Sequence, residues 1–427
     1  MAYQGVFNPS RNVSGKPVDI KQHNQRLVLS LLRRGSAMPA SELAAATGLS
    51  KTTISKILAE LCSRGLVCSV GKGDSTVEGG KKPELFSVNA GYAATVALIL
   101  PSMESFSCSV VDLCCEIVYE KEYSLPERVE YSALVAAMAD ALREAMAAVR
   151  EKGSAVCGIA VGYGGVVNTE TGEILYPMAS SSAQFRPLRD DILALYPTDE
   201  LLYIDNTCHF SGNAELLLDQ NRDLGHIAVV SCGEMVNGCS LSQPQGHPGH
   251  RGIVGEFGHL IVDPGANIGC YCGCKGCLES LISRRALMAR GRMLSGNYPF
   301  SDLAKRIQTE CVSVDQIFDA ACADDCFAQD MLWPVVKYLA ILIRALDVLE
   351  SVSKVIIQGI YARMGDRFLE MLRQEVQGYN QLNFHKNFTV EFSQYSQEGP
   401  EADKRACICG AGAYTSNYYL EQLLCDT

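Results

Sequence analysis

One short segment, Gly255 to Ser280, constrains the fold more strongly than any other part of the chain. It holds one imidazole and three thiols that could act together as metal ligands, namely His259, Cys270, Cys272 and Cys277, with Cys274 as a spare thiol. Such a closed tetrahedral set suits structural zinc, and the interleaved glycines let the backbone wrap closely round a small ion. Full coordination by protein would stabilise a loop and would activate no water. The alternative is a patch of reduced cysteines without a metal.

The other cysteines do not indicate a secreted, disulfide-stabilised protein. The chain has 427 residues, of which 48% are hydrophobic, which is enough for two or three globular domains. We expect thiols such as Cys108, Cys157, Cys232 and Cys322 to stay reduced and to pack as small hydrophobic groups. There is no apolar run of about eighteen residues and no signal-like N-terminus. We therefore expect a cytoplasmic protein that does not contact a membrane.

Charge is distributed very unevenly along the chain. The net charge is −11, yet residues 1–89 carry 12 Lys and Arg against 6 Asp and Glu, which is +6. The remainder carries 25 against 42, which is −17. A basic N-terminal region on an acidic body is the asymmetry expected when only one end of a protein meets phosphate.

A helix-turn-helix pattern occupies the basic region. A first amphipathic helix has an apolar face of Leu27, Leu29, Leu31 and Leu32 and ends at Gly35. A second helix opens at Pro39, and Gly48 supplies the positive φ of a tight corner. A third helix, Lys51 to Arg64, buries Ile54, Ile57, Leu58 and Leu61.

Short hydroxyls and cations on the other face of the third helix suit entry into a DNA major groove. Two β-prone segments round a basic glycine-rich loop then predict a wing whose lysines meet backbone phosphate or a minor groove. A flexible linker is the alternative for that stretch. The predicted DNA-binding residues are Ser50, Lys51, Thr52, Thr53, Ser55, Lys56, Lys72, Lys81 and Lys82.

Taken together, these motifs resemble those of the ROK family of repressors, uncharacterised reading frames and sugar kinases. The resemblance extends over nearly the whole chain. It includes GHLIVDPGANIGCYCGCKGCLE in the metal loop, TGLSKTTISKILAEL and GGKKP in the basic region, and GIAVGYGGVVNTETGEILYP in the body. The loop between His259 and Cys270 is one residue longer than the family usually has.

The resemblance implies an α/β fold, with the winged helix-turn-helix followed by a two-lobed actin-like, hexokinase-like (ribonuclease H-like) ROK domain. We expect the winged helix-turn-helix in residues 1–90. The first lobe would span 91–205 and be completed by a C-terminal helix, 405–427. The second lobe would span 206–404 and contain the zinc loop, 259–277.

The catalytic residue and the phosphate-binding loops that phosphate transfer requires in the family are altered in this chain. Relative to the family motif NDANAAALGE, Thr207 replaces the catalytic aspartate, and an uncharged hydroxyl cannot act as a general base near pH 7. We expect the neighbouring Asp205 to point elsewhere. The first phosphate loop reads Leu-Pro-Ser-Met-Glu without glycine, the second places Glu234 after Gly233, and the family's GG pair reads Gln358-Gly359. We therefore predict no enzymatic activity.

The residues that hold sugar hydroxyls in relatives are retained by position as Asn206, Glu256, His259 and Glu279. A sugar-like effector is the favoured ligand, and satisfied structural carboxylates are the alternative. We therefore expect a homodimeric or tetrameric repressor of carbohydrate-related genes that binds an operator in double-stranded DNA. Two other functions stay open: an ATP-dependent sugar kinase with an appended DNA-binding domain, and a regulator whose body docks on a protein partner.

Overall fold

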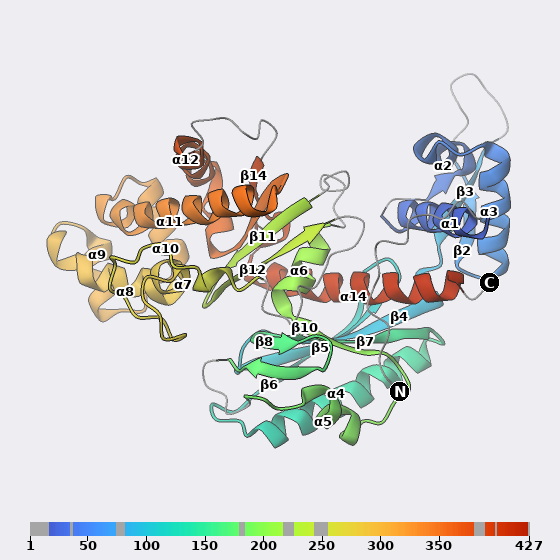
Figure 1. Ribbon diagram of the computed structural model, residues 1–427, viewed down its shortest axis with the longest axis horizontal. Helices are drawn as coiled ribbons and strands as arrows, with labels where there is room; N and C mark the ends of the chain where they lie inside the picture. Colours follow the sequence, from blue (N-terminus) through green and yellow to red (C-terminus); the bar gives the residue numbers. More distant parts are fainter. Residues whose placement is uncertain are drawn as a thin grey trace. The chain divides into compact units, whose positions relative to one another are not determined.

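The computed structural model describes residues 17–34, 37–73, 82–178, 184–216, 226–242, 255–379, 389–397 and 399–425. The chain forms two compact units, of which the first comprises Met1–Arg222 and Ile408–Thr427 and the second Asp223–Cys407 (Figure 1). The predicted α/β class is confirmed. The first unit extends past residue 205, where we placed the lobe boundary, because helix α6 (Thr207–Glu215) packs on strands β7 and β10 of that unit.

The N-terminal head is a winged helix-turn-helix, as predicted. Its elements are α1 (Pro17–Arg34), β1 (Met38–Pro39), α2 (Ala40–Thr47), α3 (Lys51–Ser63), β2 (Val67–Lys72) and β3 (Glu84–Val88), with sheet order β1-β3-β2. Gly48 ends α2 with a φ of +70°, the conformation that the sharp corner requires. Helix α3 ends one residue before the predicted Arg64, which is its C-cap. Gly35 and most of the wing loop, including Lys81, lie outside the described residues.

The core of the head includes residues from the far end of the chain. The apolar face of α3 is buried as predicted, with Ile54, Ile57, Leu58 and Leu61 all inside. The same hydrophobic cluster contains Leu113 of the first lobe, and Leu420 and Leu424 of the C-terminal helix α14 (Pro400–Cys425). The head is therefore packed on the body of the first unit.

The first lobe is a five-stranded sheet in the order β10-β7-β4-β5-β6. Its strands are β4 (Ala93–Leu100), β5 (Ser105–Asp112), β6 (Ile117–Ser124), β7 (Ala155–Tyr163) and β10 (Leu202–Asn206). β4, β5 and β6 pair antiparallel, and β7 is parallel to both β4 and β10. Helix α4 (Tyr131–Glu151) buries an apolar stripe that includes Leu134, Met138, Leu142 and Met146. Completing the lobe are β8 (Val166–Asn168), β9 (Glu173–Tyr176) and α5 (Leu188–Leu195).

The second unit repeats this arrangement on a smaller sheet with the order β12-β11-β13-β14. Its strands are β11 (His226–Cys232), β12 (Val236–Ser242), β13 (Lys354–Gly359) and β14 (Thr389–Phe392). Its helices are α7 (Leu278–Ile282), α8 (Arg284–Leu294), α9 (Asp302–Thr309), α10 (Val314–Cys322), α11 (Cys326–Glu350), α12 (Gly365–Gly378) and α13 (Gln394–Gln397). The long α11 is buried along one side and packs against α7, α8, α10 and α12.

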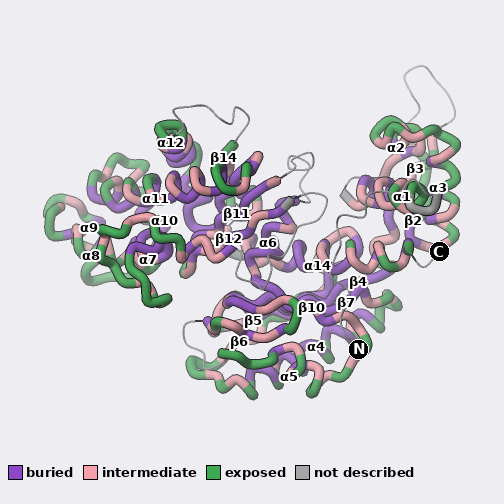
Figure 2. The backbone as a smooth tube through the Cα atoms, viewed as in Figure 1, coloured by how far each residue is buried: buried purple, intermediate pink, exposed green. Residues whose placement is uncertain are grey.

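Burial confirms most of the predicted core (Figure 2). Cys108, Cys157 and Cys232 are buried, but Cys322 is exposed, which corrects our expectation. Cys322 is the last residue of α10, beyond the turns whose apolar side chains pack into the core. Within the described ranges, every helix is too short or too polar to cross a membrane.

Candidate metal centre, ligand site and DNA-binding face

The four predicted metal ligands are brought together by one tightly folded loop. His259 ends the short 3-10 helix η4 (Phe257–His259), and Cys277 is the N-cap of α7. Between them the loop folds back on itself, so that the amide of Cys270 donates to the carbonyl of Cys274 at 2.8 Å. Gly276 has a φ of +72°, and a side chain there would lie 1.9 Å from a backbone carbonyl. Only glycine fits that position.

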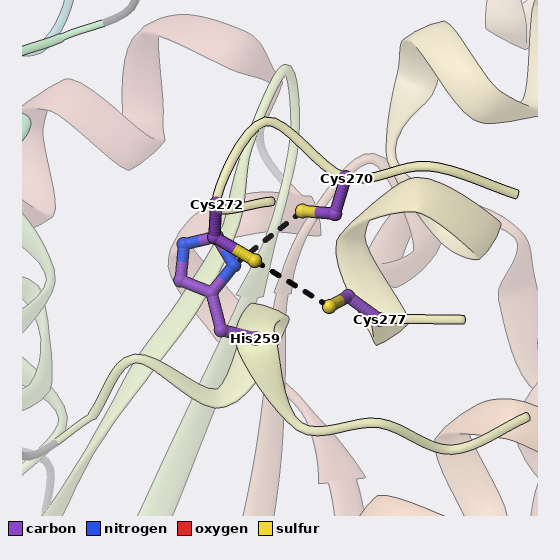
Figure 3. A group of neighbouring side chains, drawn as sticks. All are labelled: His259, Cys270, Cys272 and Cys277. Carbon is purple, nitrogen blue, oxygen red and sulfur yellow. Dashed lines mark hydrogen bonds between the residues drawn. The ribbon is translucent and has the colours of Figure 1, made fainter. Parts of the chain in front are cut away.

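The four predicted ligand side chains lie close together (Figure 3), and two of their separations match those of a tetrahedral site. All four lie within 4.8 Å of one another. The sulfurs of Cys272 and Cys277 are 3.7 Å apart, and Nδ1 of His259 is 3.6 Å from the sulfur of Cys270. Tetrahedral zinc with ordinary bond lengths would place two sulfurs about 3.8 Å apart, and a nitrogen and a sulfur about 3.6 Å apart. The donor set and its geometry therefore fit zinc, and Cys274 is not among the four ligands.

The second ring nitrogen of His259 faces two other side chains. Its Nε2 lies 3.0 Å from the hydroxyl of Tyr271 and 3.8 Å from a carboxylate oxygen of Glu256. Burial lowers the pKa of His259, which favours the neutral imidazole that ligates metals. The sequence analysis did not identify Tyr271 as a partner of His259. Its position between two predicted ligands, Cys270 and Cys272, was the signal that could have identified it. Tyr271 and Glu256 can orient the ring toward the thiols.

The predicted effector residues are divided between the two units. Asn206 belongs to the first unit, and Glu256, His259 and Glu279 belong to the second, so their joint action stays a prediction. Glu279 is 8% exposed, accepts a hydrogen bond of 3.0 Å from the amide of Val236, and has its pKa raised by burial. Asn206 caps α6 by accepting from the amide of Cys208, and its amide group donates to a backbone carbonyl.

The aspartate beside the altered catalytic position is held by side chains of its own unit. Thr207 is the first residue of α6. Asp205 is buried, lies 2.6 Å from Nδ1 of His209, and accepts a hydrogen bond of 2.7 Å from the hydroxyl of Tyr203. A carboxylate with these two partners is a poor candidate for general base at the neighbouring position.

The turn between β11 and β12, which corresponds to the second phosphate loop, carries an ion pair. The carboxylate of Glu234 contacts the guanidinium of Arg284, and the amide of Arg284 donates to the carbonyl of Gly233 at 2.9 Å. The arginine partly offsets the negative charge that Glu234 brings to this turn, a charge that would repel a triphosphate. The backbone amide of Gly233 is itself bonded to the carbonyl of Met235 and is not directed outward.

The predicted recognition helix presents a polar face at its N-terminus. Among its residues, Ser50, Lys51, Thr52, Ser55 and Lys56 are exposed. Thr53 is half-buried, and its backbone amide donates to the hydroxyl of Ser50, which caps the helix. In the wing, Lys72 and Lys82 are exposed on either side of the undescribed loop. The described head therefore exposes four of the five predicted lysines.

Comparisons with known proteins agree with this architecture. Residues 103–402 match the ROK family, and residues 20–72 match the MarR family. The chain is 25% identical to a putative xylose repressor of Caldicellulosiruptor sp. (strain Rt8B.4), covering 92% of this chain and 95% of that one. It is 26% identical to a glucokinase of Halalkalibacterium halodurans, over 57% of this chain and 73% of the enzyme.

A solved structure of a ROK family transcriptional regulator, a homologue of the E. coli MLC protein, superimposes with a TM-score of 0.72 at 21% identity. It covers 94% of this chain and 99% of its own. The family match spans both lobes of the body, and the fold, with its metal loop and N-terminal head, agrees with it. The chain belongs to the ROK family.

Proposed function

We propose that the protein is a DNA-binding transcriptional repressor of carbohydrate-related genes. In this proposal its kinase-like body binds a sugar-like effector and does not transfer phosphate. The exposed polar N-terminus of α3 carries the proposal, because it occupies the position of a recognition helix in a winged helix-turn-helix head. The repressor similar to this chain over nearly its full length supports the same function.

The direct test is binding to duplex DNA from the region upstream of the protein's own coding sequence. We expect nanomolar, salt-dependent affinity, and at least about a thousandfold weaker binding to a duplex of the same composition in scrambled order. Equal binding to both duplexes would contradict a sequence-specific regulator. No binding at any ionic strength would contradict the DNA-binding function altogether.

Structural zinc is the second part of the proposal. His259, Cys270, Cys272 and Cys277 would hold the ion, which would crosslink the loop between η4 and α7. A homodimer is the third part, since two copies of α3 can then enter successive major grooves of a palindromic operator. Sedimentation of the purified chain with and without operator would separate dimer from tetramer.

A sugar-like effector can be sought by thermal shift, because a ligand that binds only the folded state raises the melting temperature. Xylose is the first candidate, given the name of the similar repressor. The matched control is Glu279→Gln, which keeps the size of the side chain and can still accept the hydrogen bond from Val236. A sugar that stabilises the native chain but not this variant would support a role for Glu279 in the ligand site.

An ATP-dependent sugar kinase is the second candidate function, and the similarity to a glucokinase favours it. Against it stand Thr207 at the catalytic position and the engagement of Asp205 by His209 and Tyr203. An ADP-release assay over a panel of hexoses and pentoses decides between the two. A kinase body predicts equal turnover by the native chain and by the Lys51→Ala control, which changes only the head. Turnover of this kind that is lost on Asn206→Ala would overturn our assignment, whereas turnover that persists in Asn206→Ala would indicate a contaminant.

A further inference from the structure

Two arginines of the head donate hydrogen bonds to oxygen atoms of helix α14, in addition to the apolar packing and to the contact of Arg26 with Glu421. Arg33 lies near the end of α1, and Arg64 is the C-cap of the recognition helix α3. Arg33 donates to the hydroxyl of Ser416 at 2.6 Å and also contacts the side chain of Asn417. Arg64 donates to the carbonyl of Leu423 at 2.6 Å. Two helices of the head are thus fixed at two separate points of one helix.

The contacts of Arg33 depend on the geometry of its guanidinium group. Besides its contacts with α14, Arg33 donates through Nε to the carbonyl of Leu113 in the first lobe at 2.6 Å. One planar group therefore bonds the lobe and α14 at once, which a lysine ammonium on its flexible stem cannot reproduce. Burial of Leu420 and Leu424 in the core of the head secures the same part of α14 by packing.

The same helix is packed on the region that carries the predicted effector residue Asn206. Gly410 of α14 lies against α6 so closely that a side chain there would be 1.7 Å from the carbonyl oxygen of Phe210. The rings of Tyr414 and Tyr203 are stacked with centroids 4.5 Å apart. Tyr203 in turn bonds Asp205, which precedes Asn206. A displacement at the start of α6 would therefore act on α14 through these direct contacts.

We propose that Arg33 and Arg64 are positioning residues that clamp the recognition helix to α14, and that α14 transmits changes at the start of α6 to the head. All the contacts on this route lie within the first unit. The inference deepens the proposed function and rests on it, since it supplies the route by which an effector at Asn206 would alter operator affinity. Coupling between two sites requires an element whose arrangement both sites bias, and α14 contacts both α6 and the head.

A double-mutant cycle on DNA affinity tests the route without knowledge of the effector. The contact between α14 and β10 is perturbed by Tyr414→Leu, which removes the ring that stacks on Tyr203 and is not among the predicted DNA-binding residues. The clamp is weakened by Arg33→Lys with Arg64→Lys, which keeps the charge of the head. We expect Tyr414→Leu to change affinity for the upstream duplex by about tenfold in the native background, but by less than about twofold in the double-lysine background.

Two outcomes of the cycle overturn the inference. One is an equal effect of Tyr414→Leu in both backgrounds, and the other is no effect of this change in the native background. If Tyr414→Leu does not fold, Tyr203→Phe takes its place, since it removes only the hydroxyl that donates a hydrogen bond to Asp205. The charge-conserving control is Lys21→Arg, because Lys21 pairs with Glu60 inside the head; it should leave the affinity unchanged.

Amide hydrogen exchange of the free chain provides a readout that does not depend on DNA. We expect the amides of α1 and α3 to exchange about tenfold faster in the double-lysine variant than in the native chain, and Lys21→Arg to match the native chain. Unchanged exchange in the double-lysine variant would overturn the clamp. If the native chain binds no upstream DNA, the proposed function fails, while the exchange measurement still decides whether the clamp exists.

Discussion

The salt dependence of DNA binding can be worked out from the lysines on the head. Lys51 and Lys56 on α3, and Lys72 and Lys82 in the wing, are exposed in each copy. If each meets one phosphate, a dimer makes about eight such contacts, and the slope of log affinity against log salt is about −7. Raising the salt from about 50 to 200 mM should then weaken binding about 10⁴-fold.

The perturbation is the double variant Lys51→Ala with Lys56→Ala, which removes four contacts from the dimer. Its slope should be shallower by about 3.6, so the same rise in salt should weaken binding only about 10²-fold. Fluorescence anisotropy with a labelled upstream duplex, titrated at several salt concentrations, measures both slopes. The matched control is Lys305→Ala, an exposed lysine on α9 in the second unit that pairs with Asp302; its slope should equal the native one.

The difference between the slopes decides the question, because any further phosphate contact adds equally to both proteins. A difference below about one would show that the two lysines of α3 do not meet phosphate, and the placement of this helix in a major groove would then be wrong. A difference near half the expected value would indicate that one head, and not two, contacts the DNA.

Three further predictions concern the metal, the packing of α14 and pH. Cys277→Ser should abolish the zinc that mass spectrometry detects on the purified chain, whereas Cys274→Ser should keep about one equivalent; equal zinc in both refutes the ligand set. Gly410→Ala places a methyl group 1.7 Å from a carbonyl oxygen of α6 and should lower the free energy of unfolding by about 3 kcal/mol, as measured by urea titration. The control Gly378→Ala, whose new methyl group has nothing within 4 Å, should be neutral or slightly stabilising. Equal stabilities of the two variants would refute this packing. Burial raises the pKa of Asp112 above 3.8, so its contribution to stability is present below that value and lost as the pH rises through the folded pKa. Asp112→Asn should therefore gain stability relative to the native chain from about pH 4 to pH 7, and a constant difference contradicts this.

Local patterns in the sequence predicted the head and the metal loop well. The apolar face of α3 and the corner at Gly48 follow from helical spacing and from backbone sterics, which act over a few residues. The four predicted metal ligands lie within one short segment, so their spacing already limits how the loop can fold. The two-lobed body was predicted from the family resemblance and not from its periodicity.

Contacts between distant segments could not be predicted in this way. Arg33 and Ser416 are 383 positions apart, and no local pattern connects them. The C-terminal helix was expected to complete the first lobe, and its packing in the core of the head depends on side chains of both segments that only the folded chain brings together. The stacking of Tyr414 on Tyr203 was missed for the same reason, since the two residues are far apart along the chain. The partners of Asp205 are only two and four residues away, but they come from β10 and from α6, and the spacing alone does not show that their side chains meet.

The shared core of the head has a consequence for biosynthesis. Arg64 and its partner Leu423 are separated by 359 positions, so a ribosome translating at ordinary speed needs roughly 20 to 70 s to reach the second after the first. During that interval the nascent head lacks the leucines that close its core. We therefore expect an unfinished chain to bind an operator more weakly than the complete one, because the core of its head is still open.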